Sequence, residues 1–328
     1  MRKINILLLI ILFISCVDKE KAKSFFENGK AKYYTSNYKE AIKDFSKAIE
    51  LDSKYAEAYY ERGITKAQLK ERDNQGVNED INKAIELDNK YREAYYTCRM
   101  KRVLHDYEEA IKDCTKAIDD SKPNYEKAYY ERGHAKNSLK DYKGAIEDLT
   151  KTIEIDNKDR EAYIELGYAK DNLKDYKGAI KDIDKAIELD NKYKKAYYNR
   201  GHVKDNLRDY KGAIEDYTKV IELDPKDVVA YVSRGYAKGK TKDYKGAIED
   251  YTKVIELDPK DVEAYISRGY AKGKIRDYKG AIEDYTKAVE LDPKDLVVYV
   301  GRGLAYKEIG KKKETENDFK KAKELGYK

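Results

Sequence analysis

Cysteine and histidine are the residues best suited to metal binding and nucleophilic chemistry, and this chain of 328 residues contains three of each. The cysteines include no C-x-x-C pair, and no histidine lies four residues from another, so the spacings that favour a metal site are absent from the sequence. The sequence also contains no nucleophile–base pair and no phosphate-binding glycine loop. We therefore expect no enzyme activity, no catalytic residue, no metal and no cofactor.

Cys16 follows an apolar run at the N-terminus. The run extends from Ile4 to Ile14 behind a basic start, and it is too short to span a bilayer as a helix, which needs about 20 residues. This form is typical of a secretory signal peptide. The residues FISC resemble the lipobox of bacterial lipoprotein signals, in which a small residue precedes the cysteine that is lipidated, although Phe13 stands where leucine is usual.

The lipobox resemblance implies a signal peptide in residues 1–15 and a lipidated Cys16 with a short polar tether in residues 16–21. Because acyl chains gain about 0.8 kcal/mol per buried CH₂, two or three chains would hold the protein at a membrane of the bacterial cell envelope, facing the periplasm or the outside. Two alternatives stay open. The protein is secreted without a lipid, or it is cytoplasmic and keeps the N-terminus as a short anchor.

The charge pattern argues against nucleic acid as a partner. The chain has 69 basic and 63 acidic residues, interleaved along its length, whereas a nucleic-acid-binding protein normally carries a basic stripe. With 40% charged and 12% aromatic residues, the chain is too aromatic for disorder and too polar for one large core. This composition favours long amphipathic helices, and we expect neither nucleic acid nor a small-molecule substrate.

A period of 34 residues runs through most of the chain. The stretch DYKGAIEDYTKVIELDPKD begins at Asp209 and recurs unchanged at Asp243. Each unit predicts two helices, and in 194–227 the second helix follows Asp209, which is a good N-cap, and ends before Pro225. A glycine in the first helix marks eight of the units: Gly29, Gly63, Gly133, Gly167, Gly201, Gly235, Gly269 and Gly303.

Two recurring positions predict how the helices of a unit meet. A glycine inside a helix costs about 1 kcal/mol relative to alanine, so Gly201 needs a packing reason, and we expect it to face Ala213 of the second helix. A lysine usually stands three residues after the glycine, as Lys204 does. We expect its stem to lie along the helix seam with the ammonium group in water.

These features resemble the tetratricopeptide repeat (TPR) family, which has a helix–turn–helix unit of 34 residues. The resemblance covers roughly residues 22–328 and implies an all-α fold, a right-handed α-solenoid of about nine repeats. Repeats one to eight occupy 22–295. The ninth, 296–328, is expected to act as a C-terminal cap, because Lys312, Glu316 and Lys323 replace its apolar residues.

Repeats two and three break the rhythm. Two extra residues lie near KERDNQGVNED, and one is missing near RVLHDY. This irregularity indicates either a hinge or specific contact, or a decayed pair of repeats. Cys98 and Cys114 fall on the two helices of repeat three, where they are either buried small hydrophobic residues or a disulfide formed in an oxidising compartment.

The TPR resemblance also predicts a binding surface. In this family the first helices line the concave groove, where peptides bind. Two identical second helices, 209–227 and 243–261, are separated by a first helix that differs between repeats, as expected if first helices select a partner. The Lys, Asn and Arg set with which some TPR proteins hold a C-terminal carboxylate is absent, so no such tail is expected. The candidate groove residues are Tyr130, His134, Tyr168, Tyr198, His202, Tyr236 and Tyr270.

Tyrosine suits this purpose because it offers rigid area with a polar tip. The alternative for each tyrosine is packing between neighbouring helices. We thus expect a non-enzymatic scaffold, a TPR lipoprotein at the cell envelope that binds a protein or peptide in its groove. The alternative is a cytoplasmic or periplasmic TPR adaptor or assembly factor without a lipid anchor.

Overall fold

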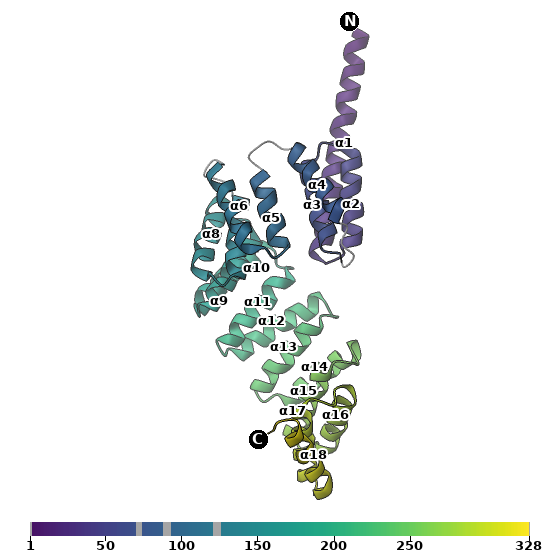
Figure 1. Cartoon of the computed structure of the whole chain (residues 1–328), viewed down its shortest axis with the longest axis vertical. Helices are drawn as coiled ribbons and strands as arrows, with labels where there is room; N and C mark the ends of the chain where they lie inside the picture. The colour runs from purple at the N-terminus through teal and green to yellow at the C-terminus, as the bar shows by residue number, and fades with distance from the viewer. Residues whose placement is uncertain (1, 70–73, 88–92, 121–125, 328) are drawn as a thin grey trace. The chain divides into compact units, whose positions relative to one another are not determined.

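A computed structural model describes residues 2–69, 74–87, 93–120 and 126–327. In this part of the chain the structure has eighteen α-helices and no strand (Figure 1). The predicted fold class is confirmed, because the chain is an α-solenoid of successive antiparallel helix pairs. It divides into two compact units, Met1–Glu165 and Leu166–Lys328, which are described separately below.

The helices of the first unit alternate with short turns. They are α1 (Arg2–Tyr34), α2 (Tyr38–Leu51), α3 (Ala56–Ala67), α4 (Asn74–Leu87), α5 (Glu93–Val103), α6 (Tyr107–Asp120), α7 (Glu126–Ser138), α8 (Tyr142–Ile155) and α9 (Arg160–Asn172), whose last residues belong to the second unit. Odd-numbered helices are the first helices of the repeats, and even-numbered helices are the second helices.

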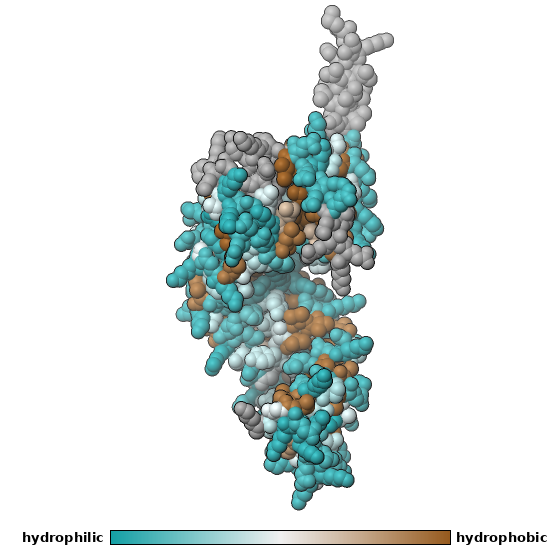
Figure 2. Space-filling model, in the orientation of Figure 1, coloured by the Kyte–Doolittle hydropathy of each residue, from teal (hydrophilic) through white to brown (hydrophobic). Residues whose placement is uncertain are grey.

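The second unit continues the same alternation. Its helices are α10 (Tyr176–Leu189), α11 (Lys194–Asn206), α12 (Tyr210–Leu223), α13 (Val228–Lys240), α14 (Tyr244–Leu257), α15 (Val262–Lys274), α16 (Tyr278–Leu291), α17 (Leu296–Glu308) and α18 (Lys312–Glu324). In the view of Figure 2 the surface is mostly hydrophilic, with hydrophobic residues in small separate patches, as expected when each repeat buries its apolar face against its neighbours.

The turn between the two helices of repeat six is set by two residues. Arg208 adopts a left-handed conformation with φ of 64°, and the N–H of Asp209 donates to the carbonyl of Lys204 at 2.8 Å, which closes the end of α11. The Asp209 carboxylate then accepts a hydrogen bond from the N–H of Gly212 at 3.1 Å and caps α12, as its sequence position predicts. Asp141, Asp175, Asp243 and Asp277 cap their helices in the same way.

The glycine of each first helix faces a large side chain rather than the predicted alanine. A Cβ atom on Gly201 would lie 2.9 Å from Cε1 of Tyr217, and one on Gly29 would lie 2.7 Å from Cε1 of Phe45. Ala213 is fully buried, but it is not among the nearest neighbours of Gly201. The expected Gly–Ala contact is therefore wrong for Gly201, although a Cβ on Gly167 or Gly269 would also meet the carbonyl oxygen of Ala179 or Ala281, at 3.3 and 3.4 Å. The glycine makes room for the large side chain, aromatic or aliphatic, that stands four residues after the alanine position of the second helix.

Repeat three fills this contact differently. Cys98 and Cys114 are separated by sixteen residues, the same separation as Gly201 and Tyr217, and each cysteine is fully buried. Their Cα atoms lie 5.1 Å apart and the two residues form a disulfide between α5 and α6. Of the two interpretations of this cysteine pair, the disulfide is the one found in the structure.

At the N-terminus, α1 is helical from Arg2 onward, so residues 16–21 lie within a continuous helix that leads into repeat one (Figure 1). The side chain of Cys16 lies outside the described part of the structure. None of the described helices is long and apolar enough to cross a membrane.

Candidate functional site

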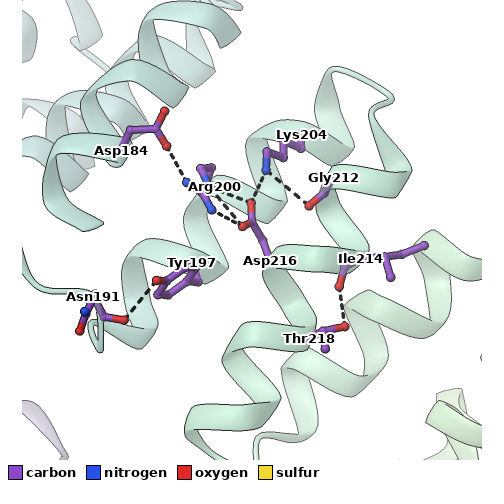
Figure 3. Close-up of polar contacts among 9 residues, drawn as sticks. All are labelled: Asp184, Asn191, Tyr197, Arg200, Lys204, Gly212, Ile214, Asp216 and Thr218. Carbon is purple, nitrogen blue, oxygen red and sulfur yellow. Dashed lines mark hydrogen bonds and ion pairs between the residues drawn. The ribbon is translucent and has the colours of Figure 1, made fainter. Parts of the chain in front are cut away.

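A buried aspartate anchors each of the first helices α11, α13, α15 and α17 of the second unit. Asp216 on α12 binds Arg200 of α11 through both carboxylate oxygens, at 2.5 and 2.9 Å, and binds Lys204 Nζ at 2.8 Å (Figure 3). Arg200 also reaches the preceding repeat, where its Nη1 lies 2.6 Å from Asp184 Oδ1 (Figure 3). One arginine therefore links its own repeat to the one before it, and Asp216 is buried beneath both cations.

The same network recurs in other repeats, where arginine and aspartate are sixteen residues apart except for Arg62 and Asp80, which are eighteen residues apart. Arg–Asp–Lys sets join Arg62, Asp80 and Lys66, then Arg132, Asp148 and Lys136 in the first unit, and Arg234, Asp250 and Lys238, then Arg268, Asp284 and Lys272 in the second. The expectation that these lysines keep their ammonium groups in water is wrong. Each ammonium pairs with a buried carboxylate, because that carboxylate would otherwise be left without sufficient partners.

This anchoring fixes which face of a first helix stays open. The residue directly after the glycine points away from the paired helix, and in the second unit this position forms an exposed row. Tyr168 is 45% exposed, Tyr236 is 49% exposed and Tyr270 is 55% exposed. The His202 side chain is 54% exposed. The row continues at Leu304, which is 51% exposed and which the sequence reasoning did not select.

The other predicted row, three residues before the glycine, is packed. The ring of Tyr198 is half-buried and lies 5.8 Å from the ring of Tyr217, centroid to centroid. In the first unit Tyr130 is half-buried, and its burial raises the pKa of its hydroxyl well above 10. Tyr130 and Tyr198 therefore lie where the packing alternative placed them, between helices.

His134 lies on α7 in the first unit, so it is described apart from the exposed row. Its side chain is 28% exposed, and its Nε2 atom lies 3.9 Å from Glu165 Oε1. The ring centroid is 6.3 Å from that of Tyr130. His134 is thus half enclosed by its neighbours in the first unit.

Acidic side chains accompany the row on α9 and α11. His202 Nδ1 lies 3.4 Å from Asp171 Oδ2, and this contact raises the pKa of His202 above 6.5. Asn206 also donates to Asp171, at 3.0 Å. Asp205 accepts a hydrogen bond from the Tyr217 hydroxyl at 3.2 Å, and burial raises the pKa of the Asp205 carboxyl.

Lysines accompany the row on α13 and α15. Lys240 Nζ lies 4.8 Å from the centroid of the Tyr236 ring, and Lys274 Nζ lies 4.9 Å from that of Tyr270. Sequence reasoning missed both lysines, although the letters YAKGK occur at 236–240 and again at 270–274. The row therefore changes from acidic to basic surroundings along the second unit.

In the first unit the irregular third repeat makes specific contacts with its neighbours. Arg99 pairs with Glu61 and lies 3.2 Å from Glu131, and Arg102 also pairs with Glu131.

Among the described residues, no three His, Cys, Asp or Glu side chains are grouped so that they could hold a metal ion. The open face of the second unit instead carries exposed aromatic rings and charged groups, which are suited to contact a ligand.

Models of known families match separate parts of the chain. One described as tetratricopeptide repeat matches residues 195–227 and 262–295, another of the same description matches 126–159 and 161–193, and one described as TPR repeat matches 29–70 and 240–275. Together these matches cover more than half of the sequence. No curated protein sequence matches the chain.

Solved structures with similar folds include YrrB, a TPR protein with an unusual peptide-binding site, at 23% identity and a TM-score of 0.50 over 55% of this chain and 93% of that one. A tetratricopeptide repeat protein from Parabacteroides merdae has 20% identity and a TM-score of 0.54 over 72% of this chain and 93% of its own. A MamA fragment from Desulfovibrio magneticus has 26% identity and a TM-score of 0.49, over 52% and 96%. The first two establish likeness of fold.

Proposed function

Because the chain belongs to the tetratricopeptide-repeat family, we propose that it is a non-enzymatic scaffold that binds a peptide or protein segment on the exposed row of its second unit. The observation that carries this proposal is the exposure of Tyr168, Tyr236 and Tyr270 on the first helices α9, α13 and α15. Large aromatic side chains contribute strongly to the binding energy of interfaces, and most of them are buried in a protein core or under a binding partner.

The contrast within the same unit strengthens this assignment. Tyr217, Tyr251 and Tyr285 of the second helices are buried, and burial raises the pKa of Tyr251 and of Tyr285 to about 12. Tyr236 and Tyr270, by comparison, keep half of their surface open. YrrB shares this fold and is a TPR protein with a peptide-binding site, which supports a peptide as the occupant.

A site-specific photo-crosslink tests the binding surface. A photoreactive phenylalanine at position 236 or 270 should crosslink to a segment of one partner protein in the producing cell. The same photoreactive phenylalanine at position 253 on α14 should not crosslink to that partner. Lys253 is a suitable control because it lies on a second helix and pairs with Glu256 at 2.8 Å. Equal crosslinking at positions 236 and 253 would count against the row as the binding surface.

We further propose that the scaffold is a lipoprotein of the bacterial cell envelope, anchored to the membrane through Cys16. The apolar run before Cys16 supports this assignment. The Cys98–Cys114 disulfide supports an exported protein, because disulfides persist in oxidising compartments and are rare in the cytosol. The alternative is a TPR adaptor or assembly factor that lacks a lipid anchor.

Metabolic labelling with a fatty-acid analogue tests the anchor. The wild-type protein should carry the label and sediment with membranes, whereas Cys16→Ala should lose the label and the membrane association. If Cys16→Ala is processed and fractionates as the wild type does, the lipid anchor at Cys16 is wrong, and the adaptor without an anchor is favoured.

A further inference from the structure

We propose that Lys240 and Lys274 make the exposed row selective for an acidic segment of the partner, an extended stretch of chain that presents carboxylates to both lysines. This inference rests on the proposed peptide binding and names the chemistry of the peptide. It is carried by two identical groups of side chains, one on α13 and one on α15.

Each group places an ammonium over an exposed aromatic ring. Lys240 lies over Tyr236 and Lys274 lies over Tyr270, with nearly the same distance from nitrogen to ring centroid, 4.8 and 4.9 Å. All four side chains are exposed. An arriving chain can therefore pack its apolar atoms on the rings and its carboxylates on the ammonium groups.

Neither ammonium is already neutralised. Within the described part of the chain, Lys240 and Lys274 form no ion pair shorter than 4.0 Å. The carboxylate of Asp205 feels the charge of Lys240, but it accepts its hydrogen bond from Tyr217. These two lysines thus present positive charge to a ligand.

Three other lysines of repeats six and seven are neutralised by ion pairs. On the second helices, Lys219 pairs with Glu222 and Lys253 with Glu256, each at 2.8 Å. On the first helix of repeat seven, Lys238 pairs with the buried Asp250 at 2.9 Å. Unlike these three lysines, Lys240 and Lys274 each combine an exposed aromatic ring with an ammonium group that forms no ion pair among the described residues.

Two glycines next to these lysines have no structural explanation within the chain. A Cβ atom on Gly239 or Gly273 would meet nothing within 4 Å, and neither residue has a positive φ. The left-handed positions of the following turns are taken by Lys242 and Arg276 instead. Because glycine weakens a helix, the two glycines are explained if they let a ligand chain approach the helix backbone beside each lysine.

The corresponding positions of the two preceding repeats are acidic. Asp171 and Asp205 stand four residues after Gly167 and Gly201, where Gly239 stands four residues after Gly235. Those carboxylates would repel an acidic segment. Recognition of carboxylates is thus assigned to repeats seven and eight. This recognition uses side-chain carboxylates along an extended segment. It does not use a C-terminal carboxylate, because the chain lacks the Lys, Asn and Arg set that holds one.

Selection from a random library of twelve-residue peptides displayed on phage tests the proposal with the full-length protein. Peptides bound by the wild type should be enriched in Asp and Glu at two or more positions, and Lys240→Gln with Lys274→Gln should remove that enrichment. The matched control, Lys219→Gln with Lys253→Gln, removes the same charge from second helices and should leave the enrichment unchanged.

Fluorescence anisotropy of the most enriched peptide gives the magnitude. Replacing both row lysines should weaken binding by about 3-fold to 10-fold, because exposed ion pairs contribute weakly, and replacing Glu by Gln in the peptide should have a similar effect. Gly239→Ala with Gly273→Ala should raise the melting temperature yet weaken binding. A purely structural role of the glycines would not give this combination.

Several results would overturn the inference. Bound peptides without acidic enrichment, or with enrichment that survives loss of the row lysines, would refute selectivity but leave peptide binding at the row standing. A selection that yields no peptide above background, or tighter binding to anionic vesicles or single-stranded DNA than to acidic peptides, would refute the acidic peptide. Absence of the position-236 crosslink is the separate outcome that refutes the proposed function.

Discussion

Replacement of Asp250 by alanine should destabilise repeat seven strongly. The Asp250 side chain is 3% exposed and binds Arg234 at 2.6 Å and Lys238 at 2.9 Å, whose side chains are 16% and 15% exposed. Removing one partner of a buried ion pair leaves uncompensated charge and costs about 3–5 kcal/mol. Here two cations lose the same carboxylate, so we expect the free energy of unfolding to fall by about 3 kcal/mol or more.

Glu256→Ala is the matched control for Asp250→Ala. It removes a carboxylate from the same helix, but Glu256 is 58% exposed and its partner Lys253 is 44% exposed. Exposed pairs contribute about 0–1 kcal/mol, so this variant should behave nearly as the wild type does. The comparison isolates burial from the loss of charge.

Hydrogen exchange of α13 and α14 is the appropriate assay, because stacked repeats do not unfold as one two-state unit. In Asp250→Ala, the amides of these helices should exchange at least about 100-fold faster, since each 1.4 kcal/mol is a factor of ten. Exchange that rises no more than in Glu256→Ala would refute the idea that buried aspartates hold the first helices in place.

Three further predictions concern folding. Gly201→Ala should lower the local free energy of unfolding by about 1–3 kcal/mol, because its Cβ would lie 2.9 Å from the facing ring; hydrogen exchange of α11 and α12 measures this, and unchanged exchange would contradict this packing. Reducing the Cys98–Cys114 bond, which closes a loop of about 15 residues, should cost about 3 kcal/mol, and free thiols in the purified exported protein would show that the bond does not form. Asp171 raises the pKa of His202, so the stability that the protonated ring contributes is present below pH 6.5 and is lost as the pH rises through the higher folded pKa. This contribution is less than about 1 kcal/mol, because the site is half-exposed. Thermal melts of His202→Gln at several pH values should lack this dependence.

Much of the fold follows from local sequence signals. The helix starts follow from Asp209 and its counterparts, because an N-cap acts through hydrogen bonds to its own helix. The partner of Gly201 did not follow, because apolar periodicity shows which face is buried but not which residue lies opposite. The burial of Asp216 was missed for a related reason, since a charged residue on a charged helix resembles a solvent-exposed one until its partners are placed.

The candidate surface was also predictable only in part. The position after the glycine gave Tyr168, Tyr236 and Tyr270, which are exposed. Tyr198 stands three residues before the glycine, and packing against Tyr217 half-buries its ring. The helical period alone does not show which of the two predicted rows is exposed. Lys240 and its counterpart were recognisable in the repeated YAKGK, but an unpaired charge is apparent only after all neighbouring carboxylates are located.

Hydrogen exchange of the full-length protein with and without a selected acidic peptide tests most directly whether the exposed row of the second unit is the binding surface. The bound peptide should slow exchange in the first helices α13 and α15, around Tyr236 and Tyr270, and leave the second helices α14 and α16 unchanged. Slowed exchange on α14 and α16, without change on α13 and α15, would contradict it.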